Sequence, residues 1–65
     1  MSASDRAELS TVRAQIADLL ERITAIAERY GDGADSAIAT DLFAAERALQ
    51  AAARAIDHAV EHLES

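Results

Sequence analysis

Two histidines near the C-terminus are the residues in this chain whose type and spacing come nearest to suggesting chemistry. His58 and His62 are four residues apart, and Glu61 stands beside them. On a helix this spacing places both imidazoles on one face, where they could hold zinc if a further ligand arrived from elsewhere. The interpretation we favour is a solvated helix C-terminus, where partly protonated histidine is favourable beside the negative end of the helix dipole. We therefore predict no metal and no cofactor, and keep His58, His62 and Glu61 as weak metal candidates.

Other catalytic arrangements are missing from the sequence. The chain contains neither cysteine nor lysine, and in the predicted hairpin no histidine is near the hydroxyls of Ser10, Thr11, Ser36 and Thr40. The segment Gly31-Asp32-Gly33, which holds both glycines, is too short and too acidic to cradle a phosphate. The sequence therefore predicts a protein without enzymatic activity.

Size and charge restrict the partners. The chain has 65 residues and a formal net charge of −6, from 12 acidic residues and 6 arginines. These arginines are spread along the chain, whereas a surface that binds nucleic acid or an anionic membrane needs clustered positive charge. A chain this small without cysteine cannot use disulfides and usually gains stability by oligomerising or by binding another protein. We expect self-association and a protein partner.

The expected location is the cytoplasm. No apolar run approaches the ~20 residues that span a bilayer, and residues 1–6 lack the apolar core of a signal peptide. Export by a route that needs no signal peptide stays open.

The first half of the chain predicts one long helix. Its apolar residues recur at alternating intervals of three and four, which is typical of a helix that lies against other helices. We expect this helix over about residues 5–30, starting at Ser4 or Asp5, with Asp5 and Glu8 at capping-box spacing. Gly31 fits the left-handed residue that follows a helix end. We call this apolar stripe the seam, and its members are Leu9, Val12, Ile16, Leu19, Ile23, Ile26 and Tyr30.

The second half predicts a helix over about residues 34–63, after a turn at 31–33 and capped by Asp32 or Asp35. Leucine or isoleucine recurs every seven residues, at Leu42, Leu49, Ile56 and Leu63, with alanines between them at Ala45, Ala52 and Ala59. Small residues at this spacing let backbones approach closely, so we expect large side chains of the first helix to pack above these alanines. Further alanines widen the apolar stripe, with Ala44, Ala48, Ala51 and Ala55 on one flank and Ala39, Ala53 and Val60 on the other.

A short turn between two long helices makes them antiparallel. The predicted fold is all-α, a single helical-hairpin domain over residues 1–65, and the broad apolar stripes predict that it dimerises into a four-helix bundle. Phe43 lies off the main stripe and is either an anchor for another subunit or an extension of the core. The residues expected to make the interaction are Leu9, Val12, Ile16, Leu19, Ile23, Ile26, Phe43, Leu49, Ala52 and Ile56.

The charged residues predict surface ion pairs and little else. Asp18 with Arg22 and Glu21 with Arg29 lie near one face, and Glu8 pairs loosely with Arg6 or Arg13. The functional hypothesis is a non-enzymatic protein-interaction or scaffold module that self-associates. Two alternatives are a small obligate subunit or regulator that docks on a larger protein, and a metal- or small-molecule-binding bundle that uses His58 and His62.

Overall fold

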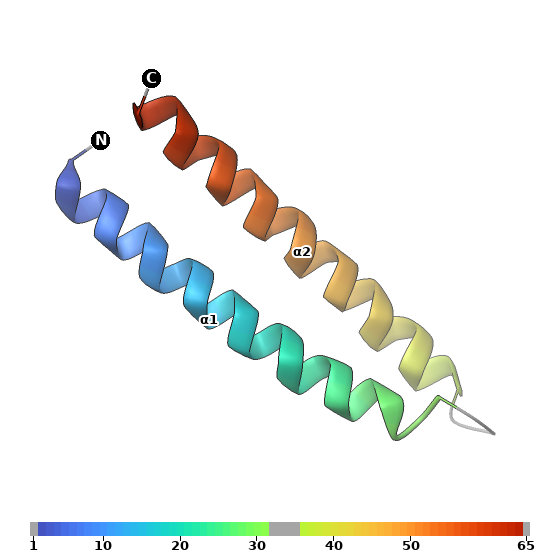
Figure 1. Ribbon diagram of the computed structural model, residues 1–65. Coiled ribbons are helices and arrows are strands. Elements are labelled where there is room, and N and C mark those ends of the chain that lie inside the picture. Colours follow the sequence, from blue (N-terminus) through green and yellow to red (C-terminus); the bar gives the residue numbers. More distant parts are fainter. Residues whose placement is uncertain (1, 32–35, 65) are drawn as a thin grey trace.

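In the computed structural model the chain forms two helices that pack against each other as an antiparallel hairpin (Figure 1). Helix α1 covers Ala3–Glu28 and α2 covers Ser36–Glu64, and the two termini lie at the same end. The structure describes residues 2–31 and 36–64. The predicted all-α hairpin is confirmed, and its dimerisation into a four-helix bundle stays a prediction. The proposed caps Asp32 and Asp35 and most of the predicted turn lie outside the described residues.

Helix α1 begins earlier than the sequence suggested, because Ser2 caps it. The Ser2 hydroxyl accepts a hydrogen bond from the Asp5 backbone N–H, and the Asp5 carboxylate accepts one from the Ser2 backbone N–H, both at 3.2 Å. This reciprocal pair satisfies N–H groups that a helix start otherwise leaves unbonded. The helix thus begins one or two residues before the predicted start at Ser4 or Asp5, and the capping box joins Ser2 to Asp5 instead of Asp5 to Glu8.

Helix α1 ends by tightening its last turn. The backbone N–H groups of Arg29 and Tyr30 donate to carbonyls three residues earlier, at 3.1 and 3.0 Å, which is the hydrogen bonding of a 3₁₀ turn. Arg29 is the C-cap and keeps right-handed helical angles. Gly31 follows without adopting a left-handed φ, so the predicted glycine cap is wrong.

The two helices touch along a strip that is rotated from the predicted seam of α1. The central row is Leu9, Ile16, Ile23 and Tyr30, as expected, and all four are buried or half-buried. Residues four places further on form the second contact row, which consists of Arg13, Leu20 and Ala27, and Ala27 is completely buried. Residues three places further on form the opposite row, Val12, Leu19 and Ile26, which leaves Leu19 and Ile26 exposed. Neighbours at i+3 and i+4 lie on opposite sides of a helical residue, so only one of these rows can face α2.

In α2, too, only one of the two rows beside the central row faces the other helix. Its central row is Leu42, Leu49, Ile56 and Leu63, all half-buried, and the row that completes the contact is Ala39, Glu46, Ala53 and Val60. Ala39 and Ala53 are buried, whereas Ala45 and Ala52 are exposed. The expected packing of large α1 residues on Ala45 and Ala52 within the hairpin is therefore wrong. Alanines occur in the rows on both sides of this central row, and the sequence pattern alone does not show which row faces α1.

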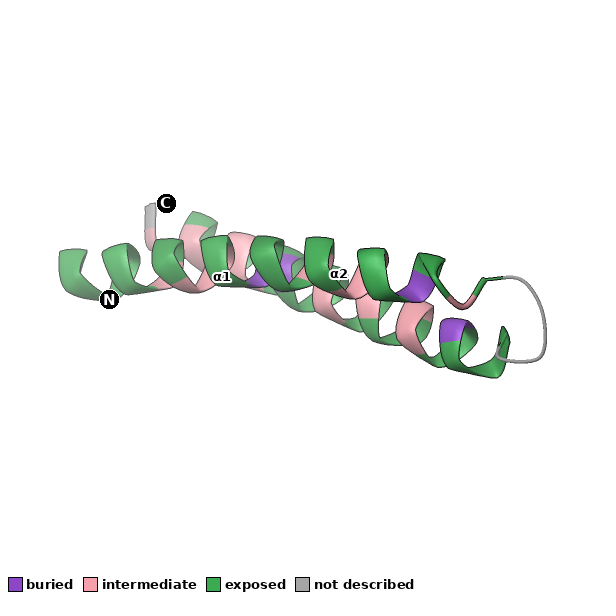
Figure 2. Cartoon of the chain, turned by 90° about the horizontal axis from the view of Figure 1, so that it is seen from below, coloured by how far each residue is buried: buried purple, intermediate pink, exposed green. Residues whose placement is uncertain are grey.

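The hairpin is a single layer of two helices with a thin core. Its Cα atoms extend over 49 × 15 × 9 Å, and the radius of gyration is 15.1 Å, compared with about 11 Å for a compact domain of this length. Most of the described chain is exposed, and the buried residues are scattered points between the helices (Figure 2). Among the described residues, neither helix combines the length and apolar character that a membrane span requires.

Candidate interaction surface

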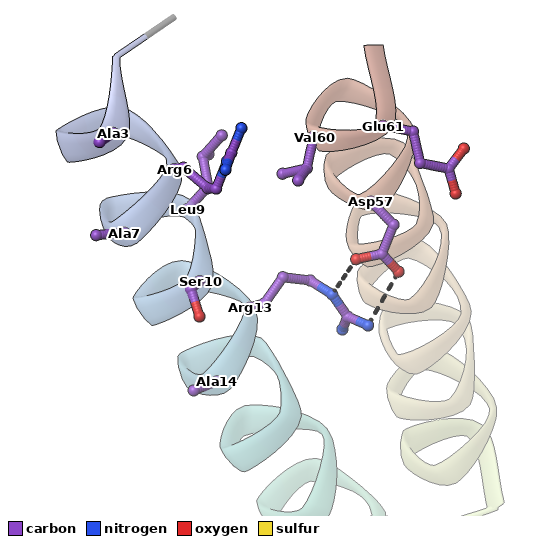
Figure 3. Close-up of a pocket in the computed structure, with 10 residues that line it drawn as sticks. All are labelled: Ala3, Arg6, Ala7, Leu9, Ser10, Arg13, Ala14, Asp57, Val60 and Glu61. Carbon is purple, nitrogen blue, oxygen red and sulfur yellow. Dashed lines mark hydrogen bonds and ion pairs between the residues drawn. The ribbon is translucent and has the colours of Figure 1, made fainter. Parts of the chain in front are cut away.

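Two polar contacts between the helices mark one face of the hairpin. The Arg13 guanidinium donates to both carboxylate oxygens of Asp57, from Nε at 2.7 Å and from Nη2 at 3.0 Å. The Thr24 hydroxyl donates to the Glu46 carboxylate at 2.6 Å. Figure 3 shows Arg13 reaching across from α1 to Asp57 on α2. We refer to the side of the hairpin that carries these contacts as the polar face.

These contacts also fix the register of the two helices. From Arg13 to Thr24 the chain advances 11 residues, and from Asp57 to Glu46 it runs back by the same 11 residues. Each step forward on α1 is therefore matched by one step back on α2. Continuing this register places Leu19 level with Ala51, so its level is within one residue of Ala52.

The remaining apolar rows lie together on the opposite side. In both helices the bonded residues lie on the i+4 side of the central row. Arg13 and Glu46 belong to the i+4 rows themselves. Thr24 and Asp57 belong to the next rows around the helix on the same side. The i+3 rows of both helices consequently share the other broad side of the hairpin. We call it the apolar face, and its members are Val12, Leu19, Ile26, Ile38, Ala45, Ala52 and Ala59.

The apolar face is largely open to solvent in the single chain. Leu19 and Ile26 are each 40% exposed and Ile38 is 44% exposed. Ala45 and Ala52 are exposed as well, while Val12 and Ala59 are half-buried. Large apolar side chains on α1 thus lie in register beside alanines on α2, on a face where the described structure provides no cover. Contiguous exposed apolar area of this kind is typical of a protein-interaction site.

The sequence-predicted interaction residues divide between two environments. Six of them, Leu9, Val12, Ile16, Ile23, Leu49 and Ile56, are buried or half-buried at the contact between α1 and α2 or at its edge. Leu19, Ile26 and Ala52 lie exposed on the apolar face. Phe43 is half-buried in the heptad row of Asp57, which places it toward the polar face. Sequence reasoning missed Ile38, although it continues the seven-residue row of Ala45 and Ala52.

A groove opens on the polar face near the two termini. It has a volume of about 870 Å³ and is lined by side chains of both helices, including Arg6, Leu9, Ser10, Val60 and Glu61. Arg13 and Asp57 also line it and bind each other across it (Figure 3). Because the charges of Arg13 and Asp57 neutralise each other, neither side chain offers a free charge to a ligand in the groove.

The histidine candidates do not gather into a metal site in the described structure. His58 and His62 are both exposed on α2, and Glu61 is exposed near them. Within residues 2–31 and 36–64, no group of three or more potential ligands is placed to hold a metal ion. Two of the hydroxyl groups considered as nucleophiles instead donate to backbone carbonyls of their own helix, Thr11 to Ala7 and Thr40 to Ser36.

The ion-pair predictions had mixed outcomes. Nη1 of Arg22 lies 3.7 Å from Oδ2 of Asp18 on the exposed side of α1, as expected from their spacing of four residues. Arg13, which was predicted to pair loosely with Glu8, binds Asp57 on the other helix instead. A contact between residues 44 positions apart leaves no local signal in the sequence.

Comparison of the chain with protein-family models, with curated proteins and with solved structures found no significant match.

Proposed function

We propose that this chain is a non-enzymatic protein-interaction module that self-associates, with a dimeric four-helix bundle as its working form. The proposal is supported by what the hairpin leaves uncovered. The buried hydrophobic residues of the described chain are Ile16, Ala27, Ala39 and Ala53, while three large aliphatic side chains of the apolar face remain exposed. A hairpin with so small a core gains most from covering that face.

The accessible surface area of the single chain also supports self-association. It amounts to 4653 Å² for a chain of 6.9 kDa, against about 4,000 Å² for a compact monomer of this mass. Packing two hairpins face to face converts two single layers into one two-layer bundle with a continuous core, which is the usual arrangement of helical domains. The role that follows is scaffolding or regulation through protein contacts.

Sedimentation equilibrium over a range of protein concentrations tests self-association. We expect the unmodified chain to be dimeric and Leu19→Asp to be monomeric, because the substitution places a carboxylate on the apolar face. Ala25→Asp is the matched control, since it adds the same charge to an exposed position of α1 away from that face, and it should remain dimeric. A stably folded monomer at every concentration would contradict the proposal. It would favour instead a small subunit that docks the same face on a larger protein.

A further inference from the structure

The size of the apolar face, the arrangement of its large and small side chains and the charges at its edges indicate what covers it. We propose that a second copy of this chain covers it, with the two-fold axis parallel to the helices, so that α1 of each copy lies on α2 of the other. This inference rests on the proposed self-association and specifies the face and the geometry through which it occurs.

The area of the face suits a dimer. A hairpin whose Cα atoms extend over 49 × 15 Å has a broad side with a projected area of roughly 700 Å², which is the same order as the ~800 Å² of accessible surface that each partner buries in a stable protein–protein interface. An identical partner brings a face of the same size and apolar character. Such isologous contact is the commonest way in which soluble proteins form dimers.

The arrangement of large and small side chains on the face favours one direction of the two-fold axis. The α1 row consists of large residues, and the parallel α2 row begins with Ile38 and continues with alanines, of which Ala45 and Ala52 lie within one residue of the levels of Ile26 and Leu19. Rotation about an axis parallel to the helices keeps the levels and exchanges the rows. Leu19 then meets the partner's Ala52, and Ile26 meets the partner's Ala45, so large side chains fill the space above small ones. An axis in the plane of the face and perpendicular to the helices would instead set the large residues of α1 against the same row of the second copy, and the alanines against alanines.

The rim of the face supplies matching charges. Arg29, the C-cap of α1, borders the face at one edge and Asp41 of α2 borders it at the other, and both are exposed. The interhelix register places the two at the same level, while helical geometry places them on opposite outer edges of one hairpin. In the proposed dimer Arg29 comes beside the partner's Asp41, and symmetry repeats the pair. Opposite charges at the rim favour this pairing over an unrelated acidic surface.

Disulfide cross-linking tests the geometry directly, because the chain has no cysteine of its own. Leu19→Cys and Ala52→Cys are prepared as separate proteins and mixed under mild oxidation. We expect a cross-link between the two variants and little product from either alone, since a disulfide requires Cα atoms about 4.4–6.8 Å apart. The matched control is a mixture of Ala17→Cys and Gln50→Cys, which are exposed on the polar face of the same helices and should give little product.

A charge exchange provides the second measurement. Arg29→Glu and Asp41→Arg should each weaken dimerisation by about fivefold, because each sets like charges together twice per dimer. The double variant Arg29→Glu/Asp41→Arg should recover the affinity of the unmodified chain. Sedimentation equilibrium gives the three dissociation constants.

The possible outcomes separate this inference from the proposed function. A monomer in every experiment overturns both. A dimer in which Leu19→Cys cross-links mainly to itself overturns the parallel axis, and a dimer in which Ala17→Cys and Gln50→Cys cross-link overturns the choice of face; in both cases self-association stands. A Leu19–Ala52 cross-link together with recovery by the double variant supports the proposed dimer.

Discussion

Arg13 and Asp57 join the two helices through a pair of parallel hydrogen bonds, 2.7 and 3.0 Å long, between residues 44 positions apart. The fork of a guanidinium matches the two oxygens of a carboxylate, which makes such a pair directional as well as attractive. Together with the bond from Thr24 to Glu46, it joins the rows of the two helices that face each other. The polar contacts lie on the side of the hairpin opposite the apolar face.

A double-mutant cycle measures the Arg13–Asp57 contact. We expect Arg13→Ala, Asp57→Ala and the double variant to give a coupling free energy of about 0.5–1 kcal/mol, limited by solvent screening because the side chains are 39% and 47% exposed. Urea unfolding at one fixed protein concentration provides the values. The longer and more exposed Arg22–Asp18 pair is the control and should couple by about 0.3 kcal/mol. Equal coupling in both pairs would contradict the special role of Arg13.

The Thr24–Glu46 bond predicts an asymmetric response to substitution. Thr24→Val keeps the shape but removes the donor, which leaves a half-buried carboxylate short of a partner and should destabilise the protein by about 1 kcal/mol. Thr24→Val combined with Glu46→Leu should recover that loss, because apolar groups then replace both partners. Urea midpoints of the two variants check this. A double variant less stable than Thr24→Val alone would show that the polar bond itself is required.

Close packing at Ala27 predicts sensitivity to size. Ala27→Leu should destabilise the hairpin by about 1–3 kcal/mol, because Ala27 is fully buried between the helices and the added side chain has no room. Ala25→Leu, two residues away and exposed, should change stability by less than about 0.5 kcal/mol. Thermal denaturation followed by circular dichroism compares the two. If Ala25→Leu were the more damaging variant, the orientation of α1 described above would be wrong.

The N-terminal cap predicts a difference between two serines. Ser2→Ala should destabilise the protein by about 0.5–1 kcal/mol, since it removes the oxygen that accepts from the Asp5 backbone. Ser4→Ala lies inside α1 and replaces serine with a better helix former, so it should be neutral or slightly stabilising. Melting temperatures of both variants test the assignment, and a larger loss at Ser4 would restore the start that the sequence suggested.

Zinc provides the test of the histidine hypothesis. We expect neither equimolar zinc nor a chelator to shift the melting temperature, because His58 and His62 would need a further ligand that the described residues do not supply. A stabilisation by zinc that disappears in His58→Ala and in His62→Ala would instead favour a metal-binding bundle.

Much of the hairpin could be predicted from the chain itself. The seven-residue rows containing Leu9 and Leu42 predicted two long helices, and helices of this length with a short connection pack antiparallel. The helix ends were less predictable. Serine and aspartate recur near the N-terminus, so capping-box spacing occurs at Ser2–Asp5 as well as at Asp5–Glu8, and the structure uses the earlier pair.

The candidate interaction surface required the tertiary structure. Sequence periodicity identifies the central row of each helix but does not distinguish the i+3 and i+4 rows beside it, so the prediction placed Ala52 rather than Ala53 against α1. Contacts between residues 44 and 22 positions apart break that symmetry. By itself, the sequence determined two amphipathic helices and their apolar rows, because local spacing fixes which side chains share a face of a helix. Only the tertiary structure decided that Ala53 is buried within the hairpin while Leu19, Ile26 and Ala52 stay on its open face, because that choice depends on how residues far apart in the sequence pack and bond across the two helices.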